Sequence, residues 1–198
     1  MERYDRELKD GKIKRIHQED ICQSLNVPEE NKYLVPSTDI VKLLINNSGK
    51  NSQYNIETFF KALLLSNLIG SEDGHAKNYS LMLQNYNIKL APIYDVFSVY
   101  DNTYDLNKTY KTAMKIGDCN IIGKLKIIDI RTFAKKNKLI FDNLLSITKE
   151  ICERLPNIIE KVFYENSNIK ELLEFKDVMI YNVNLNCNNL LNDIKNNS

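Results

Sequence analysis

Ser71-Glu72-Asp73-Gly74-His75-Ala76-Lys77-Asn78 is the stretch that decides the fold of this chain, together with Asp95, which follows Asn78 by seventeen residues. Four residues separate Asp73 from Asn78, and an apolar run ending at Gly70 leads directly into the stretch. Carboxylate and amide oxygens are the ligands that a small hard cation such as Mg²⁺ prefers. We therefore expect these three side chains to form the chemical centre of the protein.

The spacing D-x-x-x-x-N is typical of a phosphotransfer loop. Protein kinases use it to place a catalytic Asp and a magnesium-binding Asn on one loop, and Asp95 stands where the second metal-binding Asp is expected. The spacing alone often arises by chance, and the later Asp95 makes it more specific. The pattern indicates half of a phosphotransfer site.

The composition is that of one ordinary domain, which we place at residues 1–198. Of the 198 residues, 43% are hydrophobic and 27% are charged, and the net charge is +1. This balance gives no general attraction to nucleic acid or membrane, so direct nucleic-acid binding is not expected. We find no signal segment or membrane-spanning run and expect a cytoplasmic protein. Four scattered Cys without C-x-x-C indicate neither a zinc site nor a disulfide framework.

Apolar periodicity predicts a mainly α fold with one small β-hairpin after the catalytic loop. The expected helices are 40–46, 55–69, 129–138, 141–154, 157–165 and about 169–192. The hairpin is expected from the alternating runs 79–83 and 88–91, joined by 84–87. Such a hairpin returns the chain so that Asp95 lies beside Asn78, where two oxygen ligands share one cation.

Five ordered motifs carry a resemblance to a known family. They are Glu2-Arg3-Tyr4-Asp5-Arg6, Arg15-Ile16-His17-Gln18-Glu19-Asp20-Ile21-Cys22-Gln23, Lys32-Tyr33, Gly74-His75-Ala76-Lys77-Asn78 and Pro92-Ile93-Tyr94-Asp95. From the first residue to about Gly117, the chain resembles the C-terminal lobe of HipA-type serine/threonine kinases, the toxins of bacterial toxin–antitoxin systems. Five motifs in order are far more specific than any one of them. The resemblance implies a kinase-like C-terminal lobe that uses ATP and Mg²⁺.

The resemblance also implies roles for single residues. Asp73 would accept the hydroxyl proton of the attacking serine or threonine, while Asn78 and Asp95 would hold Mg²⁺ against the nucleotide phosphates. These are the parts that phosphoryl transfer needs most, because it depends on positioning and charge neutralisation.

Further residues are implied to contact the nucleotide. Glu2 and Tyr4 would offer backbone hydrogen bonds to adenine, and Asp5 would bind the ribose hydroxyls. His75 and Lys77 are expected near the phosphates. Gln18 and Tyr94 are expected close to the nucleotide as well.

The chain departs from the family pattern in two ways. HipA-type kinases carry a phosphate-gripping lobe before the Glu-Arg-Tyr-Asp segment, and we expect that lobe to be absent from these residues. No G-x-G-x-x-G occurs, and residues 117–124 miss the P-loop spacing, so we reject them as a nucleotide loop. Glu72 adds a carboxylate beside Asp73, and we expect its side chain to point into solvent.

Three functions stay open from the residues. In the first alternative, the chain is an active lobe that a separate N-terminal lobe polypeptide completes. Its partner would be a HipB-like DNA-binding antitoxin, and its protein substrate would be of the aminoacyl-tRNA synthetase class. Alternatively, it is an inactive pseudokinase or antitoxin-binding remnant. The third alternative is a decaying gene fragment without a selected activity.

Overall fold

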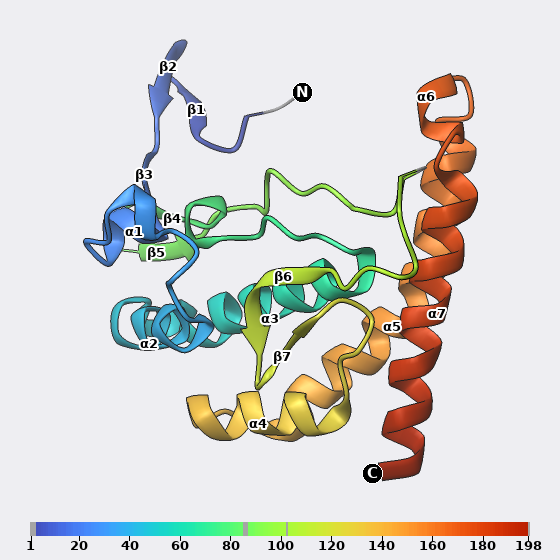
Figure 1. The fold of residues 1–198 in the computed structure, drawn as a ribbon. Coiled ribbons are helices and arrows are strands. Elements are labelled where there is room, and N and C mark those ends of the chain that lie inside the picture. Colours follow the sequence, from blue (N-terminus) through green and yellow to red (C-terminus); the bar gives the residue numbers. More distant parts are fainter. Residues whose placement is uncertain (1–2, 85–86, 102, 198) are drawn as a thin grey trace. The chain divides into compact units, whose positions relative to one another are not determined.

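A computed structural model describes residues 3–84, 87–101 and 103–197 of the chain. The fold is mainly helical with small antiparallel sheets (Figure 1). It divides into two compact units: unit 1 comprises Met1–Ala62 and His75–Asp95, and unit 2 comprises Leu63–Gly74 and Val96–Ser198. Each unit is described by itself.

Unit 1 contains three-stranded and two-stranded sheets and several short helices. Its elements are β1 (Arg6–Lys9), β2 (Lys12–Arg15), β3 (His17–Asp20), α1 (Ile21–Ser24), η1 (Glu29–Asn31), α2 (Ser37–Asn47), η2 (Gly49–Asn51), η3 (Ala76–Asn78), β4 (Ser80–Gln84) and β5 (Asn87–Leu90). The first part of α3 (Ser52–Ile69) also belongs to unit 1, and its end belongs to unit 2.

Unit 2 is built mainly from long helices. Its elements are the end of α3, β6 (Lys111–Ile116), β7 (Cys119–Ile121), α4 (Ile127–Asn137), α5 (Phe141–Glu165), α6 (Lys170–Leu173) and α7 (Lys176–Asn197). Helices α5 and α7 pack along each other. Of the helices in the described part of the chain, none has the length and apolar character needed to cross a membrane.

The predicted hairpin is confirmed and is part of a larger sheet. Strands β4 and β5 pair antiparallel, and β3 adds to the other edge of β4, in the order β3-β4-β5. Leu81 and Leu90 lie opposite each other and are both buried, so one face of the hairpin joins the core. The expected turn includes residues 85–86, which lie outside the described residues.

A buried amide fastens this hairpin to helix α3. Asn55 is fully buried, and its Nδ2 donates to Ser48 Oγ (2.8 Å) and to the carbonyl of Ile88 (3.0 Å). Its Oδ1 accepts from the backbone N–H of Leu90 at 2.9 Å. Because Ile88 and Leu90 belong to β5, one side chain fixes that strand against the helix.

Two further hairpins were not predicted. Strands β1 and β2 join through Asp10-Gly11, and both residues have positive φ, 51° and 71°. This is the Asp-Gly turn that suits a two-residue hairpin, so the signal was present in the sequence. Strands β6 and β7 join at Gly117, where a Cβ would lie 2.2 Å from the carbonyl oxygen of Asp129 and only glycine fits. Residues 117–124 thus begin with a hairpin turn.

The helix boundaries of unit 2 differ from the prediction at Pro156. We expected a break there, but α5 is one helix of 25 residues that contains this proline. An interior proline costs about 3 kcal/mol. Buried side chains on both sides of it, such as Cys152 and Phe163, continue one apolar stripe along the helix, and this packing outweighs the cost. The opposite difference occurs at the end of the chain, where the one helix predicted over about 169–192 is divided into two helices, α6 and α7.

The anchoring role of Asn55 is testable by truncation. Replacing it with Ala leaves the Leu90 N–H without its partner and the Ile88 carbonyl with only the longer hydrogen bond from Asn51 Nδ2 at 3.3 Å. Asn55→Ala should therefore lower the free energy of unfolding by about 2–3 kcal/mol. Asn47→Ala is the matched control, because Asn47 is exposed and its side chain donates to the carbonyl of Leu43 in its own helix, and it should change stability by less than about 0.5 kcal/mol. Urea denaturation followed by circular dichroism measures both. Equal losses in the two variants would contradict the anchoring role.

Candidate functional site

The loop that carries the predicted catalytic residues begins where α3 ends. Gly70 has φ +73°, and a Cβ there would lie 2.9 Å from the ring of Tyr100, so both the backbone and the packing require glycine. The N–H of Ser71 bonds the carbonyl of Ser66 at 2.7 Å and closes the helix end. The sequence predicted this helix-to-loop transition at Gly70.

Asn78 and Asp95 meet in unit 1. Asn78 Nδ2 donates to Asp95 Oδ2 at 2.6 Å, although seventeen residues separate the two positions. Asn78 is only 4% exposed, and within the described residues its Oδ1 has no hydrogen-bond partner. A buried acceptor without a partner costs about 1–3 kcal/mol. The structure therefore keeps an amide oxygen available beside a carboxylate.

Asp95 has an unfavourable backbone conformation. Its φ is 55°, in the left-handed region that residues other than glycine rarely adopt. Backbone outliers of this kind cost on the order of 1–3 kcal/mol and are concentrated at functional sites. In this conformation the Asp95 carboxylate accepts from the Asn78 amide. Two oxygen-bearing side chains in this arrangement fit the donor preference of Mg²⁺, which takes one or two carboxylates and completes its shell with water and phosphate oxygens.

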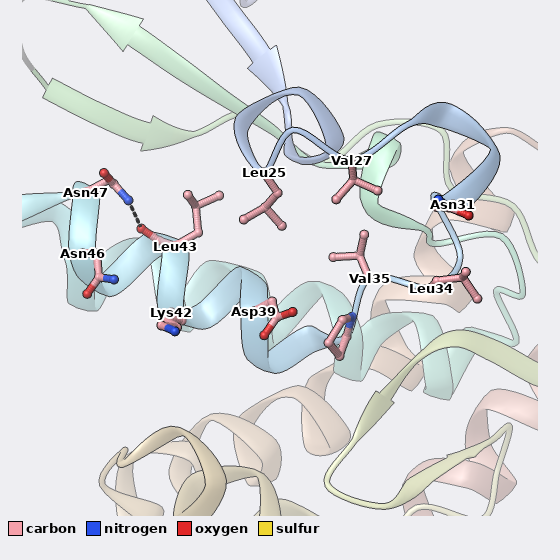
Figure 2. A pocket seen from close by; sticks show the side chains of 11 residues that line it. Leu25, Val27, Asn31, Leu34, Val35, Asp39, Lys42, Leu43, Asn46 and Asn47 are labelled. Carbon is pink, nitrogen blue, oxygen red and sulfur yellow. Dashed lines mark hydrogen bonds between the residues drawn. The ribbon is translucent and has the colours of Figure 1, made fainter.

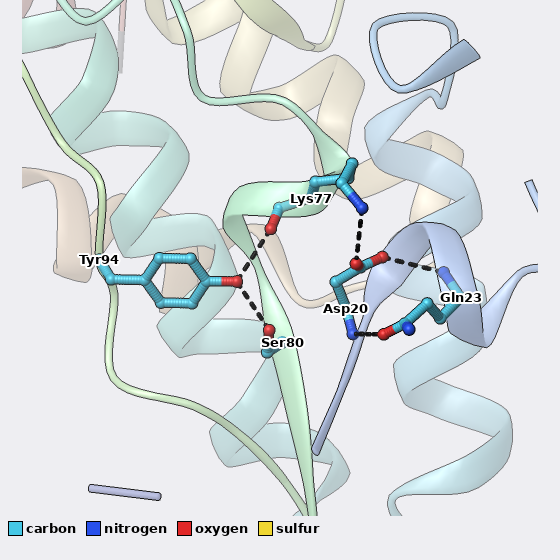
Figure 3. Close-up of polar contacts among 5 residues, drawn as sticks. All are labelled: Asp20, Gln23, Lys77, Ser80 and Tyr94. Carbon is cyan, nitrogen blue, oxygen red and sulfur yellow. Dashed lines mark hydrogen bonds and ion pairs between the residues drawn. The ribbon is translucent and has the colours of Figure 1, made fainter. Parts of the chain in front are cut away.

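Lys77 is held by the start of helix α1. Its Nζ lies 3.0 Å from Asp20 Oδ2, and this hydrogen bond raises the pKa of the lysine ammonium (Figure 3). Asp20 also caps α1, because its Oδ1 accepts from the N–H of Gln23 while the Gln23 side chain accepts from the Asp20 N–H, both at 2.9 Å. The charge expected near the phosphates is thus already paired. Asp20 was not predicted as a site residue, although its D-x-x-Q spacing is that of a capping box and indicates a helix cap at this position.

Tyr94 contacts the same segment from the other side. Its hydroxyl donates to the carbonyl of Lys77 at 2.8 Å and lies 2.7 Å from Ser80 Oγ (Figure 3). Burial raises the pKa of the phenol, so the hydroxyl keeps its proton at neutral pH. Its ring stacks on Tyr4, with centroids 6.4 Å apart and planes 15° from parallel. Tyr4 and Tyr94, both predicted near the nucleotide, therefore lie together.

Other predicted nucleotide contacts are more dispersed in unit 1. The Asp5 carboxylate accepts from Arg3 Nε (2.9 Å) and Nη2 (3.0 Å), and this pairing lowers the pKa of the Asp5 carboxyl. Gln18 is exposed on β3, opposite Met82. Glu2 lies outside the described residues.

His75 and Asp73 lie on either side of Gly74. His75 is buried in unit 1 and meets the ring of Tyr33 edge-on at 4.9 Å. Asp73 is half-buried and belongs to unit 2, so its role as proton acceptor stays a prediction. Glu72, which we expected to point into solvent, is half-buried, and its Oε1 accepts an exposed hydrogen bond from the N–H of Lys111 at 3.2 Å. That contact fixes the loop to the start of β6.

A separate pocket of about 520 Å³ lies between α1, η1 and α2 (Figure 2). Its walls are largely apolar, with Leu25, Val27 and Leu43 facing the hollow. None of the predicted site residues lines it, and Asp39 and Lys42 at its edge are a poor match for a triphosphate. We therefore assign the candidate chemistry to the pair Asn78 and Asp95.

Fold and site together define a class of protein, the kinase-like C-terminal lobe of HipA type. Comparisons with known proteins agree. Residues 1–162 match the HipA-like C-terminal domain family, and the chain belongs to that family. It is 35% identical over 141 residues to a Sinorhizobium fredii protein named "Putative kinase Y4mE", a match covering 69% of this chain and 33% of the relative.

Among solved structures, the chain is similar to one titled "Shewanella oneidensis MR-1 Toxin Antitoxin System HipA, HipB and its operator DNA complex". The TM-score is 0.76 at 22% identity, and the match covers 98% of this chain and 49% of the other. At this identity the likeness establishes the fold. The chain thus spans about a third of the length of the curated relative and about half of the solved chain.

Two substitutions at Asp20 separate its capping role from its ion pair. Asp20→Ala removes both and should lower the free energy of unfolding by about 1–2 kcal/mol. Asp20→Asn keeps an acceptor for the Gln23 N–H and loses only the charge opposite Lys77, a partly exposed pair that contributes under about 1 kcal/mol. Urea denaturation at neutral pH gives both values. Equal losses would mean that the ion pair, and not the cap, carries the stability.

Proposed function

We propose that this chain acts as the C-terminal lobe of an ATP-dependent protein serine/threonine phosphotransferase of HipA type. The observation that supports this most is the contact between Asn78 and Asp95, which leaves a buried amide oxygen beside a carboxylate. Membership of the HipA-like family makes a kinase site the natural use of that pair. Asn78 and Asp95 would hold Mg²⁺, which when bound neutralises charge on the phosphates of ATP.

Asp73 would serve as the general base in this proposal. It would accept the proton of the attacking serine or threonine hydroxyl, and it stands five residues before Asn78, the spacing of kinase catalytic loops. Tyr4 and Tyr94 would contact the adenine side of the nucleotide, in keeping with their stacked rings. Glu2, Asp5, Gln18, His75 and Lys77 complete the proposed nucleotide contacts.

Transfer would also need a phosphate-gripping lobe. The glycine spacing of a phosphate loop is absent from the sequence, so we propose that further polypeptide supplies this lobe. By analogy with the HipA–HipB–DNA structure, the partner would be a HipB-like DNA-binding antitoxin. The substrate would be a protein, with an aminoacyl-tRNA synthetase as the class that the resemblance implies.

An inactive, antitoxin-binding relative of these kinases is the second candidate. One observation favours it: two proposed nucleotide contacts are already engaged within unit 1, Asp5 with Arg3 and Lys77 with Asp20. A protein that no longer binds ATP is free to keep such pairs permanently. Nucleotide binding therefore separates the two candidates.

Calorimetric titration of Mg·ATP into the purified chain tests the proposal. Saturable binding is expected, and Asp95→Ala should weaken it on the order of tenfold or more, because a charged metal ligand is lost. Asp118→Ala is the matched control, since Asp118 is an exposed carboxylate paired with Lys136, and it should bind as the parent does. Absence of binding by the parent chain alone would indicate a partner-dependent or degenerate lobe, and absence of binding also after a complementing lobe is added would contradict the proposal and favour the inactive relative.

A second variant separates binding from transfer. Asp73→Asn keeps the size of the side chain but removes the base, so Mg·ATP affinity should stay within about twofold of the parent while phosphotransfer falls about 10²–10⁴-fold. Transfer is measured with radiolabelled ATP once a complementing lobe is added. Full transfer activity in Asp73→Asn would exclude Asp73 as the base.

A further inference from the structure

One phenol connects the two segments that carry the proposed metal ligands. Lys77 directly precedes Asn78, and Tyr94 directly precedes Asp95. The Tyr94 hydroxyl donates its single hydrogen to the carbonyl of Lys77 at 2.8 Å. A hydroxyl has only one hydrogen, so in the 2.7 Å contact with Ser80 the serine must be the donor. The network is therefore fully assigned: Ser80 to Tyr94, and Tyr94 to Lys77.

The segment before Asp95 has few other constraints. Strand β5 ends at Leu90, and residues 91–98 adopt no regular secondary structure. The N–H of Ala91 bonds the carbonyl of Ser80 at 2.7 Å, which fixes the start of the segment. Four residues later Asp95 adopts a strained left-handed conformation. A conformation of this kind persists only where its surroundings fix it, and the Tyr94 side chain supplies such a constraint one residue away.

Lys77 is itself fixed at both ends. Its ammonium pairs with Asp20, which the α1 cap orients, and its carbonyl receives the Tyr94 hydroxyl (Figure 3). The Tyr94 hydroxyl therefore restrains the backbone just before Asn78 directly, and the ion pair restrains the Lys77 side chain. Lys77 and Tyr94, the residues that precede Asn78 and Asp95, are thus both held, and Asn78 Nδ2 lies 2.6 Å from Asp95 Oδ2.

We infer that the Tyr94 hydroxyl is a positioning group that holds Asp95 against Asn78, and that Lys77 serves the same network through its carbonyl. This inference extends the proposed function, because Asn78 and Asp95 form a metal site only if that function is correct. It assigns the two ends of Tyr94 different tasks: the ring stacks on Tyr4, and the hydroxyl joins the metal-ligand segments. The hydrogen-bond partners of the hydroxyl are the Lys77 carbonyl and Ser80.

Tyr94→Phe tests the inference because it keeps the ring and removes only the hydroxyl. The readout is the exchange of the Asn78 side-chain amide hydrogens with solvent, measured by ¹⁵N NMR, with the signals assigned from their loss in Asn78→Ala. Exchange should become roughly tenfold faster in Tyr94→Phe, as expected from the loss of one or two hydrogen bonds.

Tyr100→Phe is the matched control. It also removes a buried phenol, one that is 2.6 Å from Asn186 Nδ2 in unit 2, and it should destabilise the protein comparably without changing Asn78 exchange. Unchanged Asn78 exchange in Tyr94→Phe would overturn the inference. Equal acceleration in both variants would also overturn it, because the effect would then follow general stability.

A titration with Mn²⁺ alone adds a functional readout. Broadening of the Asn78 signals by the paramagnetic ion reports binding, and the dissociation constant should rise about tenfold in Tyr94→Phe and stay unchanged in Tyr100→Phe. Equal Mn²⁺ affinity in all three proteins would overturn positioning of a metal site. If the parent binds no Mn²⁺ without nucleotide, the Mg·ATP titration decides the proposed function, and the exchange experiment decides whether Tyr94 positions Asp95.

Discussion

The amide of Asn55 is the interaction on which the geometry of the candidate site depends. It fixes β5 to α3 through the Leu90 N–H and the Ile88 carbonyl. Strand β5 pairs with β4 and so fixes the register of that strand. Strand β4 begins two residues after Asn78, and Asp95 follows five residues after β5 ends. A slip of one residue in this hairpin would turn every side chain to the opposite face. The register thus determines whether the side chains of Asn78 and Asp95 meet.

Sequence patterns predicted the parts of this arrangement that depend on local repetition. The alternating runs around residues 84–87 gave the hairpin, and the broad apolar face before Gly70 gave the central helix. The proximity of Asn78 and Asp95 followed from these two elements and is seen in unit 1. The single helix through Pro156 did not follow, because the local rule for proline is overridden by packing against α7.

The contacts that hold the site left no periodic signal. Lys77 and Asp20 are 57 positions apart, and the Tyr94 hydroxyl bonds a backbone carbonyl, an acceptor that every residue carries. Asp20 caps α1 and also pairs with the distant Lys77, but the sequence pattern indicates only the capping role. Buried side-chain contacts between distant segments are therefore visible only once the fold is known, and Asp20, Ser80 and the hydroxyl of Tyr94 belong to this class.

Two ion pairs in unit 1 differ in how firmly they are held. The Arg3–Asp5 pair is formed by residues two positions apart, and the Arg3 side chain is 62% exposed, so separating the pair costs little. The Lys77–Asp20 pair is only partly exposed and is tied to a helix cap and to the backbone before Asn78. Moving the Lys77 ammonium away from Asp20 would therefore disturb the carboxylate that caps α1, whereas the Arg3–Asp5 pair can open without such a consequence.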